Sequence, residues 1–495
     1  MMFDLHTLDD LSLLAESVEL ECKLAQGEDG KGALPKEFWL TYSAMANAHG
    51  GVVLLGVQEK QNQFSVAGIE EVEKVRRDLF NTLNNPAKVN VNLLTDAEVT
   101  TQVVEGKSVL VVQIPPASRK QKPVFLNGQP LGNTWRRLND GDRRCDDETV
   151  KRMLAEQVED SLDMRILNRF GLQDLDLDSL HAYRNIFASH KPDHPWNEPD
   201  DLTFLKMLGG WGEARDADAS GLTLAGLLMF GQWPSIAQAA PFYFLDYREQ
   251  QDQPDTETRW LDRIIPDGTW SGNLFDFYRK VIRKLTEDLK VPFVLQGDTR
   301  IDDTPLHKAL REALVNTLVH ADYSGRASVR ILKRPSGFEF RNPGILRVPV
   351  SQALHGGESD CRNRALQQMF LMINLGERAG SGLPKIRSAW EGEGRTMALT
   401  DAFEPYDQTI LTMNWPVAQT GSPIGSPIGS PIGSPSTEEK ILQQLHLQPT
   451  CSTQQLGDLL GISKRAVLKQ IEKLKLQGHL RRVGSAKSGH WEVLK

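Results

Sequence analysis

A carboxylate and an amide share one face of a helix predicted within residues 306–323 (LHKALREALVNTLVHADY). Glu312 and Asn316 are four residues apart, which makes their side chains neighbours, and three leucines mark the core side of the same helix. Further along the chain, Gly380 and Gly382 stand just before another predicted helix, where free backbone N–H groups suit phosphate oxygens. These residue types and spacings indicate a site for a phosphorylated ligand.

The same residues resemble the nucleotide site of the gyrase, histidine-kinase and MutL (GHKL) ATPases. The resemblance implies a GHKL-like α/β sandwich with ATP and Mg²⁺ as cofactors, in which Asn316 holds Mg²⁺ against the phosphates and Glu312 positions water. Where that superfamily carries an Asp-x-Gly adenine motif, this chain has Asn342 and Gly344, in FRNPGIL, and we expect both to follow a strand. We therefore expect nucleotide binding; the alternatives are a weak ATPase and a degenerate domain kept for dimerisation or scaffolding. The expected nucleotide-binding residues are Glu312, Asn316, Asn342, Gly344, Gly380 and Gly382.

The glycine-rich loop GEDGKG, residues 27–32, does not have the spacing of a P-loop. A P-loop reads G-x-x-x-x-G-K-[ST], whereas here Ala25 stands five positions before Gly30 and Gly32 follows Lys31. The sequence therefore excludes a P-loop helicase. The missing motif also contradicts the helicase-related labels sometimes given to chains of this kind.

Two acidic side chains near the N-terminus, Glu16 and Glu21, lie in ESVELECK at residues 16–23. This segment, the following helix and the buried strand of GGVVLLGV resemble the Schlafen AlbA-type domain of bacterial proteins, and the resemblance continues to TWRRLNDGD at residues 134–142. Some Schlafen-like domains are RNases that bind a divalent metal, Mn²⁺ or Mg²⁺, through three carboxylates. The resemblance thus makes Glu16 and Glu21 candidate nuclease acids.

The third acid of that nuclease motif is replaced by Gln58. An amide is a weaker ligand for a hard cation than a carboxylate, and the neighbouring Glu59 points to the opposite face of its strand. The alternative interpretation is that Glu16 and Glu21 form caps or ion pairs with Lys23 and Arg136, and we favour it slightly over nuclease chemistry.

Basic residues outnumber acids seven to two between residues 119 and 144, and Phe125 and Trp135 are interleaved with them. This composition favours nucleic-acid binding, through neutralisation of the phosphate backbone and stacking of bases. A solvated basic surface is the alternative. The seven residues are Arg119, Lys120, Lys122, Arg136, Arg137, Arg143 and Arg144.

Residues 436–495 carry a net charge of +5, so the preceding 435 residues carry −13 and the whole chain −8. Two short amphipathic helices, a tight turn at residues 461–463, a third, basic helix and two short strands resemble a winged helix-turn-helix domain. Basic residues on the third helix and the wing favour DNA binding over a protein-interaction module. They are Lys464, Arg465, Lys469, Arg481 and Arg482.

Composition sets the broad class of the protein. A chain of 495 residues exceeds the about 250–300 residues of a single compact domain. Four scattered cysteines without a C-x-x-C pair fit a reducing cytoplasm, and the longest apolar stretch is half the about 20 residues of a membrane helix. We expect a cytoplasmic homo-oligomer without a membrane partner.

Together these patterns predict a multidomain α+β protein. The predicted parts are a Schlafen AlbA-like nucleic-acid-binding domain (1–155), a mixed α/β connecting domain (156–300), a GHKL-like nucleotide-binding domain (301–416), a flexible linker with an exact GSPI repeat (417–435) and a winged helix-turn-helix (436–495). The predicted function is an ATP-responsive transcriptional regulator that binds DNA, with RNA as a second nucleic-acid partner. The alternative is a Schlafen-like metal-dependent nuclease, acting on RNA, tRNA or DNA in defence against foreign nucleic acid such as that of a phage.

Overall fold

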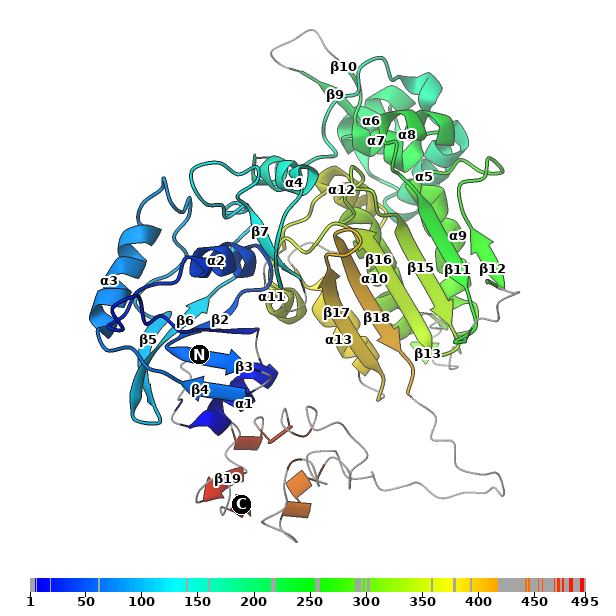
Figure 1. Ribbon diagram of the computed structural model, residues 1–495. Coiled ribbons are helices and arrows are strands. Elements are labelled where there is room, and N and C mark those ends of the chain that lie inside the picture. Colours follow the sequence, from blue (N-terminus) through cyan, green and yellow to red (C-terminus); the bar gives the residue numbers. More distant parts are fainter. Residues whose placement is uncertain are drawn as a thin grey trace, which may run out of the picture. The chain divides into compact units, whose positions relative to one another are not determined.

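The computed structural model of the chain divides into two units, each described by itself (Figure 1). The first comprises Met1–Ala117, Gln121–Lys151 and Gly421–Lys495, and the second comprises Ser118–Lys120 and Arg152–Thr420. The structure describes all residues except 1–4, 6, 18, 61–62, 139–140, 159–160, 215–219, 254–258, 290–294, 297–298, 301–302, 358, 377–379, 392–393, 417–440, 443, 446–452, 454–455, 457–466, 468–469, 472–473, 476–479, 484–489 and 494–495.

The first unit is built on a four-stranded sheet of order β1-β2-β6-β5, in which β1 and β2 are parallel and the other pairs antiparallel. Two hairpins, β3–β4 and β7–β8, lie outside this sheet. The elements are α1 (Leu8–Ser17), β1 (Leu20–Lys23), α2 (Glu37–Asn47), β2 (Gly51–Leu55), β3 (Val57–Lys60), β4 (Gln63–Val66), α3 (Val72–Leu83), β5 (Val99–Val104), β6 (Lys107–Ile114), β7 (Trp135–Leu138) and β8 (Gly141–Arg144).

Strand β2 is buried on both faces because its side chains alternate between two apolar clusters. Val53 and Leu55 pack with residues of α2 and α3, whereas Val52 and Leu54 pack with residues of α1 and the β3–β4 hairpin. The continuous apolar run of this strand thus reflects a sheet covered on both sides.

A buried polar stripe on α2 holds the segment that leads into β7. The Asn47 amide donates to the carbonyl oxygens of Val124 (2.8 Å) and Trp135 (2.9 Å), and its oxygen accepts from the Val124 N–H at 2.9 Å. Ser43 Oγ accepts from the Trp135 N–H at 3.1 Å. These bonds satisfy buried backbone groups and fix the basic β7 strand against α2.

Helix α4 (Asp147–Val158) carries the chain from the first unit into the second, whose sheet has the order β12-β11-β15-β16-β18-β17. Its remaining elements are η1 (Leu172–Asp174), α5 (Leu177–His190), η2 (Pro195–Asn197), α6 (Asp201–Leu208), β9 (Trp211–Glu213), β10 (Ser220–Leu222), α7 (Leu224–Phe230), α8 (Trp233–Ala239), β11 (Leu245–Glu249), β12 (Asp262–Ile264), α9 (Leu274–Thr286), β13 (Leu295–Gln296), β14 (Thr299–Arg300), α10 (Pro305–Val319), β15 (Val329–Arg334), β16 (Gly337–Pro343), α11 (Val350–His355), α12 (Arg364–Met372), α13 (Gly382–Glu391), β17 (Thr396–Ala402) and β18 (Gln408–Asn414).

One face of this six-stranded sheet packs on helices. Figure 1 shows α9, α10 and α13 behind the sheet, and Ile331, Phe340 and Leu411 on the packed face join the largest apolar cluster of the protein. Their neighbours Arg330, Glu339 and Ile410 point to the other face, because successive side chains of a strand alternate. This helix-and-sheet sandwich is the predicted GHKL-like fold.

Pro234 lies in the first turn of α8, where its missing N–H costs no hydrogen bond. The domain boundary predicted at residue 300 falls inside this unit, and one apolar cluster contains residues from both sides of it.

The C-terminal segment has an apolar cluster of its own, formed by Ile441, Leu445, Leu456, Val467, Ile471, Leu474, Leu480 and Trp491. The hairpin expected for the wing is present as β19 (Leu480–Val483) paired with β20 (His490–Val493). The GSPI repeat lies outside the described residues. Among the helices that the structure describes, none has the length and apolar character needed to span a bilayer.

Candidate nucleotide site and nucleic-acid-binding residues

The Glu312–Asn316 pair forms on α10 as the spacing predicts. Thr304 caps the start of this helix by accepting from the His307 N–H, and Pro305 occupies its first turn. One helical turn apart, Asn316 Nδ2 donates to Glu312 Oε1 at 3.2 Å. The amide oxygen of Asn316 is therefore turned away from the carboxylate by the same hydrogen bond, which leaves an oxygen ligand to face the pocket.

The start of α13 lies directly against this pair. A Cβ on Gly382 would overlap Glu312 Oε1 and approach Asn316 Nδ2 to 3.1 Å, so no larger residue fits without displacing the pair. Because Gly382 is the first residue of α13, backbone N–H groups of the helix N-terminus lie beside the carboxylate and the amide.

The FRNPGIL segment ends strand β16 at the other side of the pocket. Asn342 is buried within the strand and pairs in register with Thr409 of β18, which corrects the expectation that it follows the strand. Gly344 adopts φ +84°, and a Cβ there would lie 2.7 Å from Arg362 Nη1. A glycine is thus required both by the backbone conformation and by the close approach of a guanidinium.

One cavity of about 100 Å³ collects five of the six predicted nucleotide-binding residues, namely Glu312, Asn316, Asn342, Gly380 and Gly382. The sixth, Gly344, adjoins it through Arg362, which lines the cavity. Ligand pockets of drug-sized molecules typically have volumes of about 300–1,000 Å³. A nucleotide would therefore enter this cavity only if some of its lining moved.

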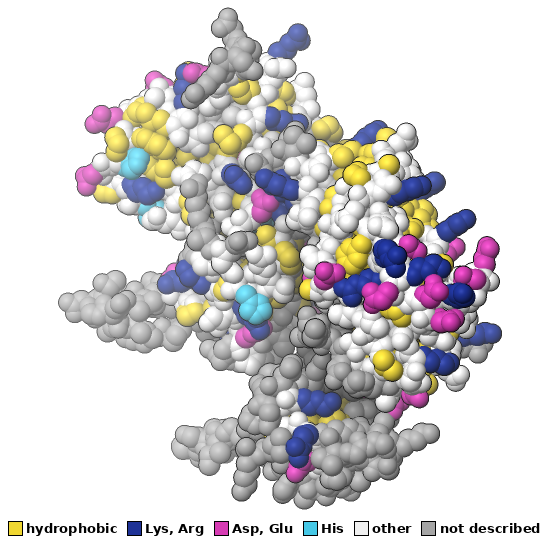
Figure 2. Space-filling model, turned by 90° about the vertical axis from the view of Figure 1, so that its left-hand side faces the viewer, with side chains coloured by type: hydrophobic (Ala, Val, Ile, Leu, Met, Phe, Trp, Pro, Cys, Tyr) yellow, Lys and Arg dark blue, Asp and Glu magenta, His cyan; other side chains and the backbone are white. Residues whose placement is uncertain are grey.

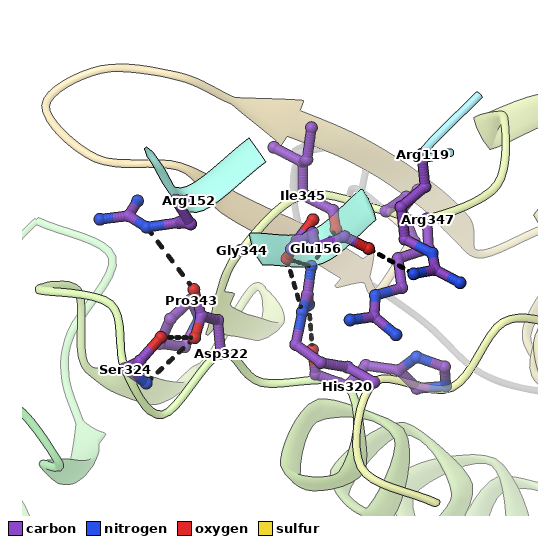
Figure 3. A network of polar contacts seen from close by, with 12 residues as sticks. Arg119, Arg152, Glu156, His320, Asp322, Ser324, Pro343, Gly344, Ile345 and Arg347 are labelled. Atoms are coloured by element: carbon purple, nitrogen blue, oxygen red, sulfur yellow. Dashed lines mark hydrogen bonds and ion pairs between the residues drawn. The ribbon is translucent and has the colours of Figure 1, made fainter. Parts of the chain in front are cut away.

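Arg362 lines the cavity with a nearly inaccessible guanidinium. Figure 3 shows the residues around it, among them Glu156, His320 and Ile345. Arg362 donates to the carbonyl oxygens of His320 (2.6 Å) and Ile345 (3.0 Å), and it makes two bonds to Glu156 Oε1, at 3.1 and 2.9 Å. Glu156 comes from α4, more than two hundred positions earlier in the chain. Sequence spacing could not have paired these two residues.

A second group of buried charges adjoins the first. Arg119 Nε lies 2.8 Å from Asp360 Oδ2, Arg347 Nη1 lies 3.6 Å from Asp360 Oδ1, and Arg119 also donates to the carbonyl oxygen of Glu156. Burial lowers the pKa of Arg347, and the positive charge of Arg362 lowers it further. Three guanidiniums face two carboxylates here, and Glu312 adds a third carboxylate at the cavity, so these charges balance.

These donors fit a nucleoside polyphosphate with its Mg²⁺. Buried guanidiniums and a helix N-terminus are the groups that bind phosphate oxygens in proteins. Among the described residues, no cluster of three His, Cys, Asp or Glu side chains could hold a metal by itself. Mg²⁺ is usually bound by one or two protein oxygens together with substrate phosphates, which Asn316 and Glu312 could supply.

The candidate nuclease acid Glu21 is already engaged. Its Oε1 lies 3.0 Å from Lys23 Nζ and its Oε2 lies 2.9 Å from Arg137 Nη2. Burial acts to lower the pKa of Arg137, but hydrogen bonding and charge from Asp142 and Glu21 outweigh it and raise this pKa overall. Ion pairing with Lys23 is as expected, whereas the arginine is Arg137, because side chains at odd and even positions of β7 face opposite ways.

The other two positions of the nuclease motif do not complete a described metal site. Glu16 lies in α1, but its side chain is outside the described residues. Gln58 is exposed on β3 and pairs in register with Ser65.

The basic residues between positions 119 and 144 separate into buried and exposed ones. Arg119, Arg136 and Arg137 are buried, which corrects the expectation of a single surface cluster: a guanidinium held by internal carboxylates cannot also reach a phosphate backbone. Lys120, Arg143 and Arg144 are exposed and Lys122 is half-buried, so these four remain candidates. On the face drawn in Figure 2, Lys and Arg are interspersed with Asp and Glu.

The predicted DNA-reading residues Lys464, Arg465 and Lys469 lie outside the described residues. On the wing, Arg481 is exposed and pairs with Glu492 of the opposite strand at 2.7 Å, and Arg482 lies in β19 with its side chain outside the described set.

Sequence reasoning missed four charged residues in or beside the pocket: Arg347, Asp360 and Arg362 line it, and Glu156 pairs with Arg362. An available signal was the density of charge in ESDCRNRALQQM (residues 358–369), immediately before an apolar helix. Charged residues there must either face water or pair inside the protein.

Four family descriptions match the chain. "Schlafen, AlbA_2" matches residues 16–146, a domain of unknown function (DUF8451) matches 151–246, "Putative ATP-dependent DNA helicase recG C-terminal" matches 329–409, and "HTH domain" matches 437–489. None of the curated proteins matches the chain.

Two solved structures are similar to the chain or to part of it. The DIP2311 protein from Corynebacterium diphtheriae is 15% identical over 96% of this chain and 95% of its own, with a TM-score of 0.41. The N-terminal domain of a RecG-related protein from Nitrosomonas europaea is 31% identical over 28% of this chain and 90% of its own, with a TM-score of 0.21.

Proposed function

Because the chain contains a Schlafen AlbA_2 domain, an ATPase-like domain of the RecG C-terminal type and an HTH domain, we propose that it is a nucleotide-responsive regulator that binds DNA. The HTH domain and the exposed basic residues of the AlbA-type domain bind the nucleic acid, and transcription is the process regulated. The pocket around Glu312 and Asn316 binds ATP with Mg²⁺ as the signal.

The observation that carries the nucleotide part is the convergence of the predicted nucleotide-binding residues on one cavity that Arg347 and Arg362 also line. Arg347 and Arg362 would neutralise phosphate oxygens, the N-terminus of α13 would donate backbone N–H groups, and Asn316 would ligate Mg²⁺. Bound Mg²⁺ would screen the phosphate charges. Glu312 holds the Asn316 amide in place through its hydrogen bond.

Ion pairs beside this pocket could transmit nucleotide binding to the rest of the chain. Arg119 and Glu156 belong to two segments by which the chain passes between the units, residues 118–120 and α4, and they pair with Asp360 and Arg362, which line the pocket. A polyphosphate would compete with Glu156 and Asp360 for the same guanidiniums. Binding would therefore favour a state in which these pairs open and the two segments are released.

The direct test measures duplex DNA binding by fluorescence anisotropy with and without Mg-ATP. We expect Mg-ATP to change the affinity of the wild type by about tenfold, a typical coupling strength. Asn316→Ala should lose this response and keep its nucleotide-free affinity, while the exposed control Ser388→Ala on α13 should behave as the wild type. If calorimetry detects no Mg-ATP binding to the wild type, the domain is a scaffold and the nucleotide part of the proposal fails.

The metal-dependent nuclease remains the alternative function for the AlbA-type domain. Purified protein with Mn²⁺ should leave tRNA and single-stranded substrates intact, because both oxygens of Glu21 are held by cations. Cleavage that Glu21→Ala abolishes would establish the nuclease instead.

A further inference from the structure

The sheet of the second unit has an arginine-rich face, opposite the face that packs on helices. Two cross-strand pairs on it join like charges, Arg248 of β11 with Arg263 of β12 and Arg330 of β15 with Arg341 of β16. Like charges directly opposite each other destabilise a sheet unless other groups compensate them. The face therefore needs counter-charge, either from the protein or from a ligand.

Asp246 supplies part of this counter-charge from within the sheet. Its buried carboxylate lies 2.5 Å from Arg248 Nη2, 3.0 Å from Arg263 Nε and 3.9 Å from Arg330 Nε. One negative charge thus serves three positive ones, and it is inaccessible to any partner.

The neighbouring strand repeats this imbalance. Glu339 of β16 lies 2.5 Å from Arg341 Nε and 3.6 Å from Arg334 Nη1. Among the residues that the structure describes on this face, five guanidiniums therefore share two carboxylates across four strands. Burial lowers the pKa of Arg330, and the charge of Arg248 lowers it further, so a bound anion would relieve an existing repulsion. Among the described residues, Arg330 Nε has no hydrogen-bond partner.

An exposed indole lies at the edge of the same face. Trp260 is 37% exposed, and its ring centroid lies 4.7 Å from Arg263 Cζ and 5.8 Å from Arg248 Cζ. Two guanidiniums thus hold a large aromatic ring in place at the surface. An aromatic platform beside a row of backbone-neutralising cations is the arrangement with which proteins bind single strands.

We propose that this arginine-rich face, formed by Arg248, Arg263, Arg330, Arg334, Arg341 and Trp260, binds single-stranded nucleic acid, DNA or RNA, with phosphates on the guanidiniums and a base stacked on Trp260. The surplus of positive charge selects a polyanion, and the aromatic ring selects one that carries flat bases. This surface goes beyond the proposed function, because neither the AlbA-type domain nor the HTH domain contributes to it.

The test measures binding of the full chain to short fluorescein-labelled oligothymidylate and oligouridylate by anisotropy over a range of salt concentrations. Trp260→Ala combined with Arg330→Gln should weaken binding about tenfold, the typical effect of losing one stacked base. Loss of one phosphate contact should also reduce the salt slope by about 0.7. Duplex DNA binding should not change.

Two matched controls separate this face from general effects of charge or aromatic content. Phe242→Ala removes an exposed aromatic ring that also lies under a guanidinium, with Arg326 Cζ 5.6 Å from the ring centroid. Arg387→Gln removes an arginine of α13, from the helical side of the unit. Neither control should weaken single-strand binding. Thermal melting checks the fold, and Trp260→Ala alone, a change outside the strands, carries the test if the double variant unfolds.

A loss confined to the face variants in either the DNA or the RNA arm supports the proposal and identifies the ligand. Unchanged binding in both arms, or an equal loss in the two controls, overturns it. Failure of the wild type to bind duplex DNA would contradict the proposed regulator while leaving this result unaffected, so the two failures are distinguishable.

Discussion

Acidic side chains occur at two predicted sites, and the groups that contact them differ between the two. Glu312 in the second unit bonds an amide one turn away and lies in a pocket that Arg347 and Arg362 also line. Glu21 in the first unit is held by two cations, one on each oxygen. The first site thus places guanidiniums where an anion could bind, whereas at the second both carboxylate oxygens already pair with cations. Residue type alone does not decide which chemistry is available.

The largest expected effect comes from Gly382→Val. A side chain at this position overlaps Glu312 and displaces Asn316, so Mg-ATP binding measured by calorimetry should fall more than about a hundredfold. Ser388→Val, an exposed change on the same helix, is the matched control and should bind normally. Wild-type affinity in Gly382→Val would show that the pocket is not the nucleotide site.

Arg137→Gln tests whether ion pairs hold Glu21 in the first unit. Its removal leaves Glu21, Asp142 and Glu19 without a shared cation in a half-buried setting, so the free energy of unfolding should fall by about 3 kcal/mol. The exposed Arg143→Gln should change stability by less than about 0.5 kcal/mol. Denaturant titrations of both variants check this. Equal stabilities would mean that Glu21 is not stabilised by its ion pairs and could bind a metal.

Glu156→Gln removes the carboxylate that pairs with Arg362 and would compete with a phosphate for it. Affinity for Mg-ATP should rise about fivefold, within the usual range of coupling energies, while the effect of Mg-ATP on DNA binding should shrink. Glu148→Gln, at an exposed position of the same helix, is the control. A weaker affinity for Mg-ATP in Glu156→Gln would contradict the competition.

The smallest effect concerns pH. Burial lowers the pKa of His320 at the edge of the pocket to about 4, and the charges of Arg362 and Arg347 act in the same direction. The unfolded chain binds a proton at this residue near pH 6.5, so its contribution to stability is complete above that pH and is lost as pH falls towards 4. Stability of His320→Gln should therefore depend less steeply on pH between 6.5 and 4 than that of the wild type, whereas His181→Gln, at an exposed position, should follow the wild type. Identical slopes for wild type and His320→Gln would contradict this.

Local patterns were sufficient to predict the elements that carry the candidate site. The four-residue spacing of Glu312 and Asn316, the glycines before α13 and the alternation in β2 depend on helix and strand periods, which are properties of the chain itself. Asn342 was expected to follow a strand, whereas hydrogen bonding to β18 extends β16 through Pro343 and so includes Asn342.

The sequence by itself determined the order of the domains and the absence of a P-loop, and it pointed to Glu312, Asn316 and Gly382 but not to the arginines of the candidate site. The tertiary structure decided which charges are available. Arg119, Arg137 and Arg362 read alike as basic residues in the sequence, yet each is buried against a carboxylate contributed by another element. The physical reason is that removing a charge from water requires a partner, and that partner is supplied by folding rather than by proximity in sequence.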